Sequence, residues 1–336
     1  DLLDWEPFLT EDNHHVATPD TAGYHLTTDL MDHAIRFVSD QQSVAPDKPF
    51  FLYLAFGAGH SPHHVPKELI DAYEPVFEKG WDATRADRLA RQQAMGLVPG
   101  TTRLPPRNPG VPVWDDLPDE ERRLYVRFQA AFAAMITHTD REIGRMIDTL
   151  ERIGALTNTI FVVMSDNGAS QEGSHAGTLH QGRYFERAPM TLAQSIDKID
   201  EIGETQWFNN YPLGWAMAGN TPCKFYKQNT HGGGVRDPLV VHWPAGLAAD
   251  SAGSLRHQFH HVSDLTPTIL DVVAAPLPTT VNGIAQMPLH GTPMTYTFHE
   301  PDAPTRKVVQ HFEMLGHRGI VADGWKAVTL HDARTL

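Results

Sequence analysis

Three short apolar segments, separated by stretches of helical periodicity, constrain the fold of this chain most strongly. The segments are 50–56 (FFLYLAF), 159–164 (TIFVVM) and 239–241 (LVV). Each is rich in β-branched or aromatic residues and lacks polar alternation, which is typical of strands that are covered on both faces. Such strands, alternating with helices, predict an α/β domain in which a mostly parallel sheet lies between layers of helices.

Helical periodicity is clearest over residues 120–153, where apolar side chains recur every three to four positions and Gly154 follows as a stop. A second helix is expected over 27–38, with a threonine as its N-cap. A third is expected over 264–273, with an aspartate as its N-cap and a proline in its first turn.

Two long stretches interrupt this pattern. Residues 74–117 are rich in Pro, Gly and Arg, and residues 170–230 are rich in Gly, Asn and aromatic side chains. Loops of this length are usually functional rims or partly disordered segments. We therefore expect both stretches to border the functional site and to decide which substrate it accepts.

The composition changes near the C-terminal end of the chain. Residues 308–313 and 319–328 predict antiparallel strands, with a turn at Asp323–Gly324. We therefore predict a catalytic α/β domain over 1–290, followed by the beginning of a small antiparallel subdomain over 291–336.

Charge and cysteine content narrow the class of protein. The 27 basic and 41 acidic side chains give a formal net charge of −14. Because binding to nucleic acid requires a basic face, this charge argues against a nucleic-acid partner. No run of eighteen apolar residues is present, which argues against a membrane span. Cys223 is the single cysteine, so no internal disulfide can form. Because an Asn-x-Ser/Thr acceptor is also lacking, we favour a bacterial cytoplasm or periplasm.

The most informative motif is Ser-Asp166-Asn167-Gly, which directly follows the second apolar segment. Ligands of open α/β sheets gather at the carboxyl ends of strands. A carboxylate beside an amide oxygen offers the hard ligands that Ca²⁺ and Mg²⁺ prefer. The same residues are also typical of an Asx turn that ends a strand. Two residues cannot complete a Ca²⁺ shell of about six to eight oxygens, so further ligands would have to come from elsewhere.

A histidine-rich stretch, Gly-His60-Ser-Pro-His63-His64, follows the first apolar segment. A histidine there can donate to a developing oxyanion or protonate a leaving group. His60 is nearest to the strand end and is the preferred candidate, whereas His63 and His64 are expected to line the rim. Three histidines within five residues are also typical of a metal-binding tract.

The third motif, 226–238, contains Lys227, His231 and a run of glycines before the third apolar segment. Glycines let the backbone approach a ligand closely, and a Lys or Arg nearby can pair with an anion. We take Lys227 and His231 as candidate substrate-binding residues. A hard-cation site, an acid–base histidine and an anion-binding lysine together suit the hydrolysis of a phosphate or sulfate ester.

Three segments follow one another in the chain: PFFLYLAFGAGHSPHHVP, HTDREIGRMIDTLERIGALTNTIFVVMSDNGAS and NTPCKFYKQNTHGGGVRDPLVVHWP. In this order they resemble the type I sulfatases of the alkaline-phosphatase-like superfamily, most closely their bacterial arylsulfatase branch. The resemblance covers nearly the whole chain. It implies one Ca²⁺ held by Asp166, Asn167 and two consecutive aspartates near the N-terminus. It also implies that His60 and Lys227 contact the sulfate group and help the alcohol to leave.

The family nucleophile is a formylglycine made from the cysteine of Cys-x-Pro-Ser-Arg, which implies a formylglycine-generating enzyme as a partner. This chain has no such motif, and Cys223 stands in another context. The Asp-Asp pair and a Lys-x-His motif of the family are also missing. We therefore expect a fragment without the N-terminal nucleophile segment, inactive by itself.

Other departures from the family pattern are smaller. Gly232 stands where the family usually has a glutamate, Lys224 competes with Lys227 as the catalytic lysine, and Asp140 is expected to be structural. The preferred hypothesis is an arylsulfatase that acts on small-molecule sulfate esters. The alternatives are a phosphatase or phosphonate monoester hydrolase of the same superfamily, and a non-catalytic paralogue.

Overall fold

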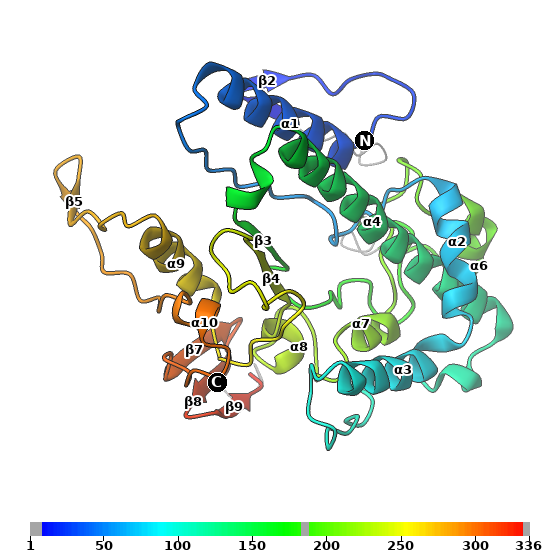
Figure 1. Ribbon diagram of the computed structural model, residues 1–336. Coiled ribbons are helices and arrows are strands. Elements are labelled where there is room, and N and C mark those ends of the chain that lie inside the picture. Colours follow the sequence, from blue (N-terminus) through cyan, green and yellow to red (C-terminus); the bar gives the residue numbers. More distant parts are fainter. Residues whose placement is uncertain (1–8, 183–187, 332–336) are drawn as a thin grey trace.

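The computed structural model describes residues 9–182 and 188–331 of the chain (Figure 1). Helix α4 (Asp119–Arg152) is the central element, 34 residues long, and it packs against α1 (Leu26–Val44) and α2 (Lys67–Phe77). Its first turn is acidic, which complements the positive end of the helix dipole. None of the helices in the described residues is long and apolar enough to cross a membrane.

A cluster of aromatic rings forms the main core beside α4. The ring of Trp81 lies 4.7 Å from that of Trp114 and 5.9 Å from that of Trp215. The indole of Trp215 donates a hydrogen bond of 2.8 Å to the carbonyl of Tyr125 on α4. A Cβ on Gly214 would lie 2.5 Å from the ring of Trp81, so only glycine fits there. This packing fixes α7 (Leu213–Gly219), which leads into the glycine-rich segment.

The predicted helices are confirmed, with changes at their ends. The 120–153 prediction corresponds to α4, and 264–273 corresponds to α9 (Leu265–Val272) after the short helix η4 (Val262–Asp264). Helix α1 extends six residues beyond the predicted end at 38. Its cap is not the predicted threonine: the ring of His25 accepts a hydrogen bond of 3.2 Å from the backbone N–H of Thr27.

The strands differ from the prediction. β3 (Phe161–Met164) pairs antiparallel with β4 (Leu239–His242), with Val162 opposite Val241. Every named strand pair in the described part of the chain is antiparallel, so the expected mostly parallel sheet is not found there, whereas the mixed α/β character is. An apolar run predicts burial but carries no information on the direction of pairing.

Segment 50–56 forms no strand in the described structure, which corrects the prediction. Its backbone has no ladder partner among the described residues, and Phe51 and Tyr53 are 75% and 82% exposed. Val240 on β4 is 59% exposed, so the β3–β4 pair is not covered on both faces as predicted. The apolar surface is present, but the described residues do not bury it.

The two predicted loop regions contain helices. Residues 74–117 include the end of α2, then α3 (Gly80–Ala94) and η1 (Trp114–Asp116). Residues 170–230 include α7, together with α6 (Leu192–Asp197) and η3 (Ile199–Glu201). The many Ala, Arg and Gln residues of α3 are good helix formers, and this propensity outweighs the flanking Pro and Gly. The remaining short elements are β1 (Leu9–Glu11), β2 (His14–Val16), η2 (Leu156–Asn158), α8 (Gly232–Val235), β5 (Thr280–Val281), β6 (Ile284–Ala285) and α10 (Tyr296–His299).

The C-terminal antiparallel sheet is confirmed and has three strands, β7 (Val309–Met314), β8 (His317–Ala322) and β9 (Trp325–Thr329). Asp323 and Gly324 both have positive φ and form the predicted turn between β8 and β9. Contacts cross the predicted domain boundary, because Asp264 binds the side chain of Lys307. The boundary at residue 290 stays a prediction.

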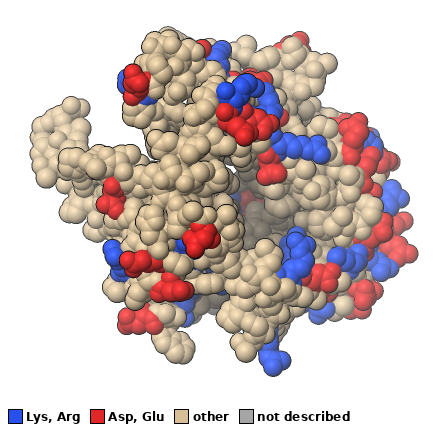
Figure 2. Space-filling model, viewed as in Figure 1, with Lys and Arg blue, Asp and Glu red and all other residues tan. Residues whose placement is uncertain are grey.

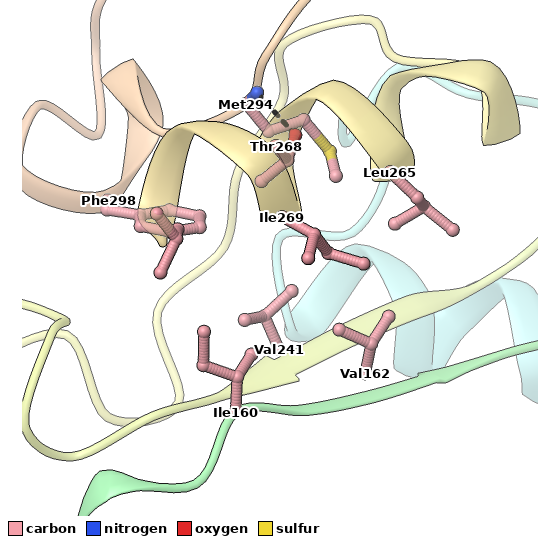
Figure 3. A pocket seen from close by; sticks show the side chains of 9 residues that line it. Ile160, Val162, Val241, Leu265, Thr268, Ile269, Met294 and Phe298 are labelled. Atoms are coloured by element: carbon pink, nitrogen blue, oxygen red, sulfur yellow. Dashed lines mark hydrogen bonds between the residues drawn. The ribbon is translucent and has the colours of Figure 1, made fainter. Parts of the chain in front are cut away.

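Helix α9 covers one face of the β3–β4 pair, as Figure 3 shows. A cavity of about 20 Å³ remains between them, lined by residues that include Val162, Val241 and Ile269. Its one polar side chain, Thr268, already donates to the carbonyl of Asp264 at 2.6 Å. The space suffices for about one water molecule, but its apolar walls offer no set of partners for one, so we expect it to be dry.

Charged side chains are unevenly distributed on the face shown in Figure 2. They gather over the helical part of the molecule, on the right, whereas the part formed by α9 and the β5–β6 hairpin, on the left, carries few. That hairpin instead exposes apolar side chains, among them Val281 and Ile284.

Candidate active site

His60 and Lys227 meet although 167 positions separate them in the sequence. The Nζ of Lys227 lies 3.1 Å from the Nε2 of His60. Glu172 joins them: it accepts a hydrogen bond of 3.2 Å from Lys227 Nζ, and its Oε2 is 3.6 Å from His60 Nε2. The structure thus brings two sequence-predicted site residues together and adds a carboxylate that the sequence analysis missed.

The loop after segment 50–56 orients His60. Its backbone N–H donates to the carbonyl of Gly57, and its Nδ1 lies 2.7 Å from the carbonyl of Ser61. Because a carbonyl can only accept, Nδ1 carries a proton, and Nε2 is the ring nitrogen that faces Lys227. Ser61 is anchored by donating from its Oγ to the carbonyl of Asn209 at 2.6 Å. The ring of His60 is therefore aimed at Lys227 by its own loop.

Asn220 ties the loop after β3 to the segment that carries Lys227. Its Oδ1 accepts a hydrogen bond of 2.8 Å from the N–H of Ala169, and its Nδ2 donates to the carbonyl of Phe225 at 2.9 Å. The N–H of Lys227 also donates to the carbonyl of Ala169 at 3.1 Å. These three bonds hold the two segments side by side. Asn220 was not among the predicted site residues, because a lone asparagine at a helix end is a common cap.

The loop that follows β3 carries Asp166 and Asn167. Next to them, the N–H of Gly168 donates to the carbonyl of Gly234 at 3.3 Å, and a Cβ on Gly168 would lie 1.7 Å from a backbone oxygen of the glycine run. Only glycine permits this close approach. Asp166 and Asn167 are thereby held beside the glycine-rich segment.

Asp166 and Asn167 have the donor chemistry of a hard-cation site. Asp166 is exposed, and a second carboxylate, Asp237, lies near it; burial, and to a lesser extent the charge of Asp166, raises the pKa of Asp237 to about 6. However, residues 9–182 and 188–331 contain no cluster of three or more His, Cys, Asp or Glu side chains that could hold a metal ion. The ligand type therefore fits Ca²⁺, but these residues do not complete its shell.

His231 faces a different neighbourhood. Its ring centroid lies 4.4 Å from that of Phe225, and burial, together with the nearby side chains of Lys326, His317 and Lys224, lowers its pKa. Lys326 and His317 belong to the C-terminal sheet. Among the described residues, no hydrogen bond or ring contact joins His231 to the His60–Lys227 pair. Its role in substrate binding stays a prediction.

His63 does not line the rim, which corrects the expectation. It is fully buried, stacked on Tyr211 and edge-on to Phe132, each with a centroid distance of 5.4 Å. Neither ring nitrogen has a hydrogen-bond partner among the described residues. Burial, assisted by the nearby His60 and His64, lowers its pKa to about 3. His64 is partly buried, with its Nε2 2.7 Å from the carbonyl of Trp207.

The depressed pKa of His63 predicts a loss of stability in mild acid. The folded state keeps the ring neutral, whereas the unfolded chain takes up a proton below about pH 6.5, so stability falls as the pH drops from there toward 3. At pH 5 the loss from this group is about 2 kcal/mol. We expect His63→Phe to remove this part of the stability loss between pH 7 and pH 5. The measurement is the free energy of urea unfolding at the two pH values.

His290, which is exposed, supplies the matched control for that experiment. His290→Phe is expected to keep the wild-type pH dependence. An unchanged slope in His63→Phe would show that His63 is not the group responsible.

The other residues singled out in the sequence have structural surroundings. Lys224 is exposed, and its carbonyl accepts from the N–H of Gly233 at 2.8 Å. Asp140 is exposed on α4, and Cys223 is partly buried beside Gly232. None of these three side chains contacts the His60–Lys227 pair within the described part of the chain.

Comparisons with known proteins agree with the sequence resemblance. A family model described as Sulfatase matches residues 3–275. The chain is 32% identical over 251 residues to an uncharacterized sulfatase of Schizosaccharomyces pombe, covering 73% of this chain and 43% of the relative. It is 28% identical over 226 residues to an arylsulfatase of Klebsiella aerogenes, covering 67% of this chain and 46% of that protein.

Solved structures support the fold. The complex of Ps i-CgsB with k-i-k-neocarrahexaose matches with a TM-score of 0.51 at 21% identity, over 94% of this chain and 49% of that chain. A putative sulfatase, yidJ from Bacteroides fragilis, matches with a TM-score of 0.51 at 17% identity, over 88% of this chain and 47% of that chain. The chain thus spans less than half the length of each of these four proteins.

Proposed function

Because this chain belongs to the sulfatase family, we propose that the protein containing it hydrolyses sulfate monoesters, with aryl sulfates as the first substrates to test. The observation that carries this proposal is the approach of Lys227 Nζ to His60 Nε2 at 3.1 Å, beside the loop of Asp166 and Asn167. Hydrolysis of an anionic ester requires a cation that binds the sulfate oxygens and a proton donor for the leaving oxygen. Lys227 and His60 lie close enough together to supply both.

In the proposed reaction, the bond between sulfur and the alcohol oxygen breaks and the elements of water are added. The products are the alcohol and hydrogen sulfate. The ammonium of Lys227 binds a sulfate oxygen by charge-assisted hydrogen bonding. A proton shared between Lys227 Nζ and His60 Nε2 can be delivered to the leaving oxygen, which would otherwise depart as an unstable anion.

We further propose that the nucleophile is a formylglycine, produced by a formylglycine-generating enzyme, and that one Ca²⁺ is held by Asp166 and Asn167 with other ligands from outside the described residues. When bound, the ion would neutralise the charge of the sulfate group. Support comes from the family resemblance and from the oxygen donors of the two side chains.

Removal of the metal tests this assignment. The complete protein, expressed with a formylglycine-generating enzyme, should hydrolyse 4-nitrophenyl sulfate, and a chelator should abolish turnover until Ca²⁺ is restored. We expect Asp166→Ala to lower kcat/KM about 10²-fold or more, because a charged ligand is lost. The same assay with 4-nitrophenyl phosphate measures any phosphatase activity.

Asp140 provides the control for Asp166, since it is an exposed aspartate on α4. Asp140→Ala should retain wild-type rates and the wild-type response to chelator. Full activity of the Asp166→Ala variant would rule out the proposed metal site, and hydrolysis of the phosphate alone would rule out the sulfatase assignment.

A further inference from the structure

Glu172 occupies the position where an anionic ligand of Lys227 and His60 would be expected. Its Oε2 lies 3.2 Å from Lys227 Nζ and 3.6 Å from His60 Nε2. The side chains of Glu172 and Lys227 are only 19% and 20% exposed. The charge of Lys227 is therefore largely balanced by a carboxylate of the same chain.

Two neighbours hold the Glu172 carboxylate in place. Ser170 Oγ donates to Oε2 at 3.0 Å and accepts from the backbone N–H of Glu172 at 3.0 Å. Gln228 Nε2, on the residue after Lys227, donates to Oε1 at 3.2 Å. With Lys227, these contacts give both carboxylate oxygens a hydrogen-bond donor. The position of the Glu172 side chain is therefore fixed by several specific contacts.

A sulfate monoester and Glu172 compete for the ammonium of Lys227. Both are oxygen anions, and a sulfate oxygen within hydrogen-bond distance of Lys227 Nζ would stand within a few ångström of the Glu172 carboxylate. Like charges at that separation repel each other, the more so because the site is partly shielded from water. Binding of the ester therefore places a second anion near the same ammonium, and this weakens the Glu172–Lys227 ion pair.

We propose that Glu172 is an internal counter-anion of the candidate sulfate site. It keeps Lys227 and His60 together when no ligand is bound, and it lowers the affinity for sulfate so that the product can leave. Glu172 is thus a positioning residue that sets anion affinity. This inference rests on the proposed function, because it takes Lys227 as the group that binds sulfate.

The test is the binding of inorganic sulfate to the 336-residue chain, measured by isothermal titration calorimetry at constant ionic strength. Glu172→Gln keeps the shape and one acceptor but removes the charge. We expect it to bind sulfate about 3- to 10-fold more tightly, since solvent and salt screen part of the repulsion. Glu172→Asp, which retains the charge, should stay within about 2-fold of the wild type.

In the complete enzyme, Glu172→Gln should lower KM for 4-nitrophenyl sulfate and also lower kcat, because bound sulfate leaves more slowly and Lys227 loses the negative charge of its ion-pair partner. A purely structural role would not produce opposite effects on affinity and turnover. Glu151→Gln, an exposed position at the end of α4, is the charge-matched control and should change neither. Glu172→Ala is the second neutral variant should Glu172→Gln fail to fold.

The outcomes separate this inference from the proposed function. A gain in sulfate affinity below 3-fold in both neutral variants, or a loss, overturns the role of Glu172. If Lys227→Ala binds sulfate as well as the wild type, the assignment of the anion site itself is wrong. If Lys227→Ala weakens binding while the neutral Glu172 variants change nothing, only the inference about Glu172 fails.

Discussion

Replacing Lys227 by alanine is expected to lower kcat/KM for sulfate esters about 10²- to 10⁴-fold in the complete enzyme, which corresponds to roughly 2.7–5.4 kcal/mol of transition-state stabilisation. The variant loses the ammonium that lies 3.1 Å from His60 Nε2 and leaves Glu172 facing the site without its cation. Binding of the anionic ester and protonation of the leaving oxygen both suffer. Initial rates with 4-nitrophenyl sulfate measure the effect.

Lys224 is the matched control for this experiment. It lies three positions before Lys227, is exposed, and makes no side-chain contact with His60 within the described residues. Lys224→Ala should change kcat/KM by less than about 3-fold, as expected for an exposed charge. The reverse order of effects would identify Lys224 as the catalytic lysine.

Replacing Lys307 by alanine should lower the free energy of unfolding by about 3–5 kcal/mol at pH 7, the typical result of breaking a buried ion pair. Lys307 is 6% exposed, and its Nζ donates to the fully buried Asp264 at 2.8 Å. The backbone N–H groups of Thr292 and His261 donate to the same carboxylate. Burial raises the pKa of Asp264, but these hydrogen bonds outweigh it, so the net shift is downward.

The decrease in unfolding free energy caused by Lys307→Ala should become smaller at low pH, because a protonated Asp264 carries no charge that a cation must balance. Lys79→Ala, which removes an exposed ion pair with Asp87, is the control and should cost less than about 1 kcal/mol. The double variant Asp264→Asn/Lys307→Met should recover part of the loss, because it leaves no uncompensated charge. An equal loss for Lys79→Ala and Lys307→Ala would contradict the buried network.

Local patterns in the sequence were sufficient for several elements. The 3.6-residue periodicity of 120–153 predicted α4 to within one residue at each end, and Asp323–Gly324 predicted the turn between β8 and β9. These features depend on the conformational preferences of neighbouring residues, which act within one turn of helix or one hairpin. Helix α4 and the β8–β9 turn could therefore be predicted directly from the sequence.

Pairing direction could not be obtained in this way. The runs 159–164 and 239–241 form adjacent strands, but they pair antiparallel, and 50–56 has no partner among the described residues. Apolar content measures how much surface a segment can bury. It does not state which strand lies beside it, which is decided by contacts between segments far apart in the chain.

By itself, the sequence determined that His60, Lys227, Asp166 and Asn167 follow or precede apolar segments, and it determined the family that these motifs resemble. Only the tertiary structure decided which of two neighbouring histidines faces the site: His60 lies against Lys227, whereas His63 is enclosed by aromatic rings. It also introduced Glu172, which lies 55 positions from Lys227. Residue type sets what a side chain can do chemically, but its partners and burial arise from long-range packing.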